Sequence, residues 1–174
     1  MQLFIRTIRG WILRILGVWV YDRGIVHTHY TVEDFDAKTG EFVRRQEFEY
    51  NCLLNEGITE LLKLACSTGA TKFDNGNANT GVGDSDTAAA AAQTGLQGGN
   101  KAYMAMEATY PQVANQTVTF RSTFGAGDGN FVWKEATIAN GNSDAAKNLN
   151  RKVQAMGEKT AAVTRIITTA ITIE

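Results

Sequence analysis

The C-terminal run TAAVTRIITTAITIE constrains the fold more than any other part of the chain. It is rich in β-branched residues, and its pattern repeats every two residues, which is typical of a strand with one face in a core. The residues of one face are Val163, Arg165, Ile167, Thr169, Ile171 and Ile173. We therefore predict a strand at the C-terminus, and a strand this apolar must be covered by other β-structure.

Other alternating segments extend this prediction along the chain. A hairpin is expected around the turn at residues 36–40, where Gly40 supplies a left-handed conformation. Further strands are expected over 79–83, 102–109, 117–124 and 131–139. About seven or eight strands separated by turn signals predict a mainly β protein, a β-sandwich or jelly-roll-like domain over residues 21–174, because short sheets must cover their apolar faces with one another.

One helix is clearly indicated, in the stretch NCLLNEGITELLKLACSTG. Asn55 is a good N-cap and Gly69 can end the helix, so we expect about ten helical residues between them. Its apolar stripe consists of Leu54, Ile58, Leu61, Leu62 and Ala65. Asp84, Ser85 or Asp86 could cap a second short helix through the alanine run that follows them.

Residues 1–20, MQLFIRTIRGWILRILGVWV, differ from the rest of the chain. At about 100° per residue, large apolar side chains recur on one face and arginines fall on the other. The apolar face holds Ile5, Ile8, Ile12, Ile15 and Trp19, and the arginines are Arg6, Arg9 and Arg14. We predict that residues 1–20 form an N-terminal docking arm, either an amphipathic helix or an extended segment.

Several roles of this arm can be weighed from its residues. A secretion signal is disfavoured because Arg14 interrupts the apolar run and no small-residue cleavage site follows. A membrane-spanning helix is disfavoured because the arginines would lie in hydrocarbon. Docking on another protein or subunit is favoured; packing on the chain's own domain and binding at a membrane interface are the alternatives.

The rest of the sequence contains little that points to catalysis. The formal net charge of −1 disfavours nucleic acid as a partner. GVGDSDT lacks the Gly-Lys-Ser/Thr ending of a phosphate-binding loop, and no nucleophile motif is present. His27 and His29 share one face of the first expected strand, but two ligands do not make a metal site. We expect a protein that is not an enzyme, with no cofactor and no metal.

The chain has two cysteines, Cys52 and Cys66, which flank the expected helix. We predict that both are free thiols buried as small apolar residues.

Four stretches carry a resemblance to a known group of proteins. They are LLNEGITELLKLACSTG, GVGDSDTAAAAAQTGLQGGNKAYMAM, YPQVANQTVTFRSTFGAGDGNFVWKEATIANG and LNRKVQAMGEKT. They resemble small virion structural proteins of tailed bacteriophages, among them capsid decoration (cement) and tail-associated proteins, and the resemblance covers about Asn51 to Glu174. The resemblance implies a protein of the virion, assembled in the bacterial host cytoplasm.

These observations predict a non-enzymatic virion structural protein, a capsid decoration protein that docks on the shell through residues 1–20. The implied partners are the major capsid protein or other virion proteins, with the chain in many copies and able to form a homo-oligomer. A tail, collar or head-to-tail connector component is the alternative. From another class, a membrane-associated or carbohydrate-binding β-module is the alternative, with Trp133 and Tyr110 as candidate stacking residues.

Overall fold

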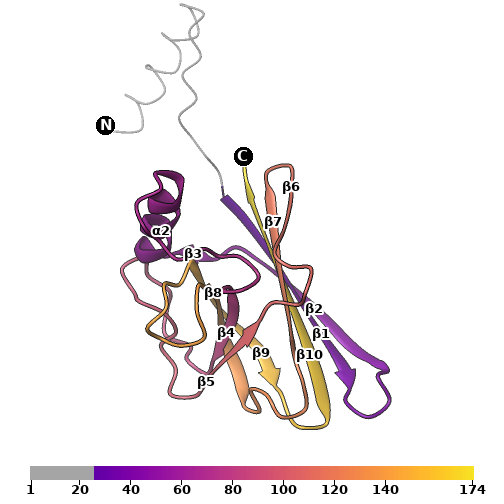
Figure 1. The fold of residues 1–174 in the computed structure, drawn as a ribbon. Helices are drawn as coiled ribbons and strands as arrows, with labels where there is room; N and C mark the ends of the chain where they lie inside the picture. The colour runs from indigo at the N-terminus through magenta and orange to yellow at the C-terminus, as the bar shows by residue number, and fades with distance from the viewer. Residues whose placement is uncertain (1–25) are drawn as a thin grey trace, which may run out of the picture.

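The computed structural model describes residues 26–174, which form two antiparallel five-stranded sheets and one short helix (Figure 1). The first sheet has the order β2-β1-β10-β7-β6, with β1 (Val26–Asp36), β2 (Phe42–Glu49), β6 (Gln112–Ala114), β7 (Thr117–Phe124) and β10 (Val163–Ile173). The second has the order β3-β9-β8-β4-β5, with β3 (Cys52–Leu53), β4 (Asn79–Gly83), β5 (Lys101–Ala105), β8 (Val132–Ala139) and β9 (Asn150–Glu158). The mainly β class predicted from the sequence is confirmed.

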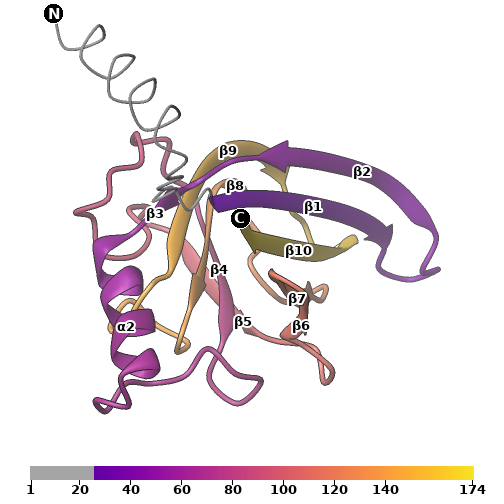
Figure 2. The same cartoon turned by 90° about the horizontal axis from the view of Figure 1, so that it is seen from above.

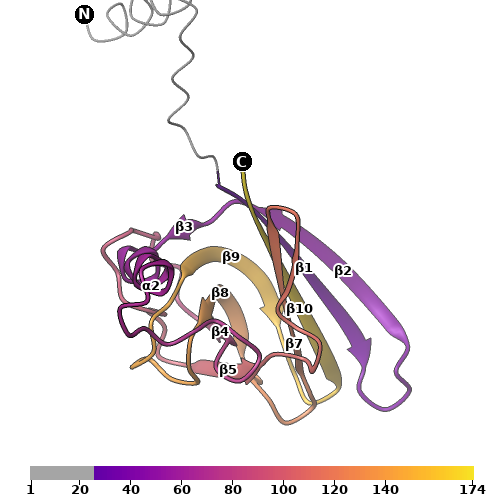
Figure 3. The same cartoon turned by 45° about the horizontal axis from the view of Figure 1, so that its top comes forward.

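Figure 3 shows the strands of the two sheets beside one another. The core between them contains apolar side chains from both sheets. Its main cluster comprises Tyr30, Val32, Phe124 and Ile167 of the first sheet and Val82, Trp133, Ala136 and Met156 of the second. Within β10, alternate residues from Arg165 to Ile171 are buried. The predicted C-terminal strand and its inward face are therefore confirmed along this stretch, whereas Ile173 at the end of β10 is 54% exposed.

The predicted hairpin is also present, as strands β1 and β2 (Figure 1). Asp36 forms its turn, since its Oδ1 accepts hydrogen bonds from the backbone N–H groups of Lys38 (2.9 Å) and Thr39 (2.8 Å). Gly40 has φ +73°, the left-handed conformation that favours glycine. The local chemistry of this turn was therefore sufficient to predict it.

The predicted helix is α2 (Asn55–Ala65), but it packs differently from what its apolar stripe suggests. Its N-cap is Leu54, not Asn55, and no side chain caps it. Its buried residues are Gly57 and Glu60. A Cβ on Gly57 would overlap the backbone of the segment at residues 148–149, so the helix approaches this segment as closely as glycine allows.

This packing leaves most of the apolar stripe of α2 in solvent. Ile58 is 39% exposed, Leu61 40% and Leu62 62%, and of the stripe only Leu54 is buried. Glu60 is buried instead because its Oε1 accepts hydrogen bonds from the Thr71 N–H and from the Asn140 side-chain amide, at 2.9 and 3.4 Å. The hydrogen bonds of a buried carboxylate thus set the orientation of the helix.

Two local predictions are wrong. The alanine run at 88–92 is not helical, because Gln93 takes up its backbone groups: its Nε2 donates to the Ala88 carbonyl and its Oε1 accepts from the Ala90 N–H. The cysteines are free as predicted, but Cys52 is half-buried and Cys66 is exposed at the C-cap of α2.

Candidate functional site

The predicted docking arm lies outside the described residues. Its members are Ile5, Ile8, Ile12, Ile15, Trp19, Arg6, Arg9 and Arg14, and the described part begins at Val26. The histidines are half-exposed on β1: His29 lies 3.6 Å from a carboxylate oxygen of Glu49 and His27 3.9 Å from one of Glu174. Within residues 26–174 no group of three or more His, Cys, Asp or Glu could hold a metal ion.

The surface best suited to binding is an apolar groove of about 220 Å³ at one end of the molecule. Its lining is Val26, Leu53, Leu61, Phe73, Val118, Phe120, Leu149, Ile171 and Ile173. Phe120, Leu149 and Ile171 are nearly fully buried, whereas Leu61 and Ile173 are exposed. We call this groove, together with Ile58 and Leu62 of α2, the apolar end surface.

Segments far apart in the sequence meet at this end. β1 begins and β10 ends here, with Val26 paired to Ile173, and β7 contributes Val118 opposite Ile171. α2 supplies Leu61. In Figure 1 this helix, the start of β1 and the C-terminus all lie towards the top of the molecule, and Figure 2 views that end from above. The sequence predicts the apolar stripe of the helix and the apolar faces of the strands one by one, but only the tertiary structure brings them together in one groove.

A second hollow, of about 360 Å³, is polar. Its lining is Gly76, Asn77, Asn79, Ala105, Gly141 and Asn142. The side-chain amides of Asn77 and Asn79 are already used, since they donate to Asp74 and to the Asn77 carbonyl. No residue of this lining ionises, so the hollow offers no acid, base or nucleophile.

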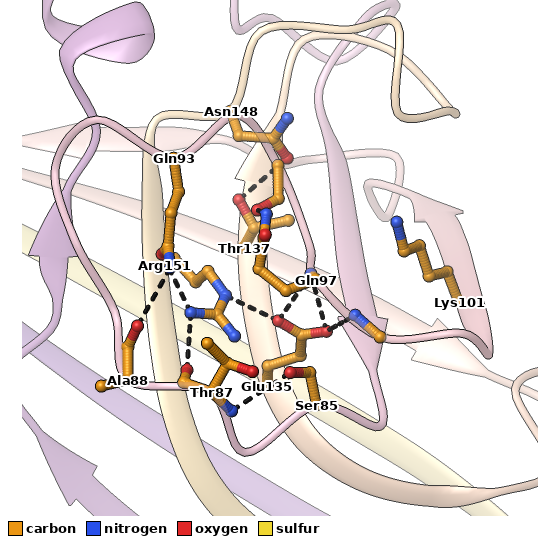
Figure 4. A network of polar contacts seen from close by, with 12 residues as sticks. Ser85, Thr87, Ala88, Gln93, Gln97, Lys101, Glu135, Thr137, Asn148 and Arg151 are labelled. Atoms are coloured by element: carbon orange, nitrogen blue, oxygen red, sulfur yellow. Dashed lines mark hydrogen bonds and ion pairs between the residues drawn. The ribbon is translucent and has the colours of Figure 1, made fainter.

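Glu135 and Arg151 form a buried ion pair in the interior (Figure 4). Arg151 Nε donates to Glu135 Oε2 at 2.6 Å, and both side chains are fully buried. The carboxylate also accepts the backbone N–H groups of Gln97 and Gly98, while Arg151 Nη1 donates to the Thr87 carbonyl and to Gln93. The pair therefore fastens the loop between β4 and β5 to the second sheet.

A second buried charge cluster lies on the first sheet, and its arginines also donate to backbone carbonyls of β9 in the second sheet. Arg165 makes two hydrogen bonds to the Asp34 carboxylate (2.6 and 2.9 Å), and Arg44 makes a third at 2.6 Å. The Arg165 guanidinium lies 4.8 Å from the ring centroid of Trp133. Burial alone would raise the pKa of Asp34, but the two guanidinium groups outweigh it and hold the pKa below its usual range.

This cluster predicts how stability depends on acid. Because the pKa of Asp34 is lower in the folded chain than in the unfolded one, its stabilising contribution is present above about pH 4 and is lost as the pH falls further. We expect Asp34→Asn to lower stability at neutral pH and to flatten the loss of stability below pH 4. Urea unfolding at a series of pH values measures this, and equal acid slopes in the two proteins would contradict it.

The carbohydrate-stacking prediction is wrong for Trp133. Its side chain is fully buried, its ring meets Phe124 edge-on at 4.7 Å, and its Nε1 donates to the Gly129 carbonyl. A sugar cannot stack on this ring without opening the core. Tyr110 is half-buried and packs against the core.

No helix within residues 26–174 has the length and apolar character needed to cross a membrane. Comparisons of the chain with protein-family models, with curated proteins and with solved structures found no match.

Proposed function

We propose that the chain is a non-enzymatic structural protein of a tailed-phage virion that docks on its partner through residues 1–20 and the end of the molecule where β1 begins. The observation that carries this proposal is the apolar end surface, which exposes Leu61, Leu62 and Ile173 beside the start of β1. Exposed apolar side chains grouped in this way mark interaction sites.

The bonding of the buried charged side chains supports a structural role. The buried carboxylates Asp34 and Glu135 are both engaged by arginines, and Glu60 holds a loop through backbone and amide hydrogen bonds. Among residues 26–174, Asp34, Glu60 and Glu135 thus use their carboxylates to stabilise the fold. The two sheets with a shared core fit the proposed β-sandwich class, a rigid body of the kind a particle component needs.

Within the virion, the proposed location is the capsid, where the chain decorates the shell in many copies. Residues 1–20 supply an apolar stripe that the major capsid protein can cover, and the arginines on the other face can pair with acidic groups on the shell. The resemblance over Asn51 to Glu174 supports a virion protein but does not favour shell over tail. A tail or connector component therefore remains the second proposal.

Absolute quantification of this chain's peptides in purified virions, relative to the major capsid protein, tests the proposal. We expect one copy per capsid subunit or a simple fraction of it. A ratio far below this, of a few chains per particle, would overturn decoration in favour of the tail or connector. Absence from the particle would overturn the virion role altogether.

A further inference from the structure

The apolar end surface is larger than the fold itself requires. α2 reaches the domain through Gly57 and Glu60, so its remaining contacts do not need Ile58 or Leu62. Leu61 lines the groove, and Ile58 and Leu62 are its neighbours on α2. Their exposed side chains therefore continue the apolar surface of the groove across the helix. A surface of this kind is stabilised when another apolar segment covers it.

The dimensions of the groove indicate what kind of group it holds. At about 220 Å³ it is smaller than the pockets that enclose most small ligands. No ionisable side chain lines it, so it has no means to orient a charged ligand. It suits one or two large apolar side chains, with the exposed face of α2 continuing the contact beyond them.

The chain itself carries a segment of matching chemistry that directly precedes this surface in sequence. The described residues begin at Val26, which lines the groove, and residues 1–25 precede it. Of the arm's apolar stripe, Trp19 is the residue closest to Val26 in sequence. Between residues 19 and 26 an extended chain reaches at most about 25 Å, ample to bring this side chain to the groove.

The short tether also favours the chain's own arm over that of another molecule. A short connection gives an effective local concentration on the order of millimolar, which free partners in dilute solution do not match. If residues 1–20 form the amphipathic helix that their periodicity predicts, the arginines fall on the face away from the apolar stripe and stay in water when the stripe is covered.

We infer that, in the free chain, residues 12–19 pack on the apolar end surface of the same molecule, with Ile15 and Trp19 seated in or beside the groove. This cis contact goes beyond the proposed function and does not depend on it. If the arm does bind a virion partner, that partner displaces it from the groove. The contact therefore keeps the apolar stripe out of water until assembly.

Paramagnetic NMR on the full-length chain tests this contact. Cys66 is exposed and lies one helical turn after Leu62, since its N–H donates to the Leu62 carbonyl. A spin label on Cys66, in a chain with Cys52→Ser, therefore reports on the apolar end surface. We expect the indole N–H signal of Trp19 to lose most of its intensity in a dilute sample and to regain it when the label is reduced.

Matched arm variants show whether the apolar stripe causes this effect. Ile12→Ser with Ile15→Ser removes apolar groups from the stripe, and we expect it to restore the Trp19 signal. Leu13→Ser with Val18→Ser removes apolar groups from outside the stripe, and the signal loss should persist. Both leave the described domain unchanged, so misfolding cannot mimic the result.

Two outcomes would overturn the inference. An unaffected Trp19 signal in the spin-labelled chain would mean that the arm does not lie on this surface. Signal loss in an isotope-labelled chain mixed with a separate spin-labelled, unenriched chain would mean that the arm binds a second copy. The virion measurement is independent of both, so the proposed function and the cis contact can fail separately.

Discussion

Arg151→Met is expected to lower the free energy of unfolding by about 3–5 kcal/mol, because it leaves the fully buried Glu135 carboxylate without its cation. The N–H groups of Gln97 and Gly98 still bond this carboxylate, but they carry no full charge. The loop between β4 and β5 should also loosen, since Arg151 holds the Thr87 carbonyl. Urea unfolding monitored by circular dichroism measures the stability.

Lys134→Met is the matched control for this prediction. Lys134 pairs with Asp86 at 2.9 Å, but both side chains are exposed, so removing this cation should change the free energy of unfolding far less than removing Arg151 does. In the double variant Glu135→Gln/Arg151→Met the buried charge is gone, and part of the lost stability should return. A loss in Arg151→Met no greater than that in Lys134→Met would contradict the assigned role of the buried pair.

Trp133→Ala is expected to lower the free energy of unfolding by about 3–5 kcal/mol as well, for a different reason. The indole is fully buried, meets Phe124 edge-on and lies beneath the Arg165 guanidinium, so its removal leaves a cavity between the sheets. Urea unfolding again measures the loss of stability.

The neighbouring Val132→Ala is its control, because Val132 is 44% exposed and should cost far less. If the two variants were equally stable, the core would not be centred on Trp133.

Local chemistry made parts of this fold predictable. The β1–β2 turn depends on Asp36 and Gly40, whose preferences act over a few residues. β10 was predictable because a two-residue period directly reports burial of one face. The existence of α2 followed from its composition and flanking residues in the same way.

Packing overruled the sequence pattern where a polar or small residue makes a long-range contact. The apolar stripe of α2 predicted the wrong buried face, since Gly57 fits against the Leu149 backbone and Glu60 bonds Thr71. The alanine run favours a helix, yet Gln93 binds its backbone in another conformation. Propensity is a weak preference that a few tertiary hydrogen bonds outweigh.

The candidate site also combines features that the local sequence predicts with features that only packing decides. The sequence by itself determined a mainly β protein and placed an apolar stripe in residues 1–20, because periodicity and side-chain chemistry are properties of each segment alone. Only the tertiary structure decided that Leu61, Val118 and Ile173 form one groove next to Val26, and that Glu135 and Arg151 are buried together. These arrangements depend on strand order and register, which arise when distant segments compete to cover the same apolar surface.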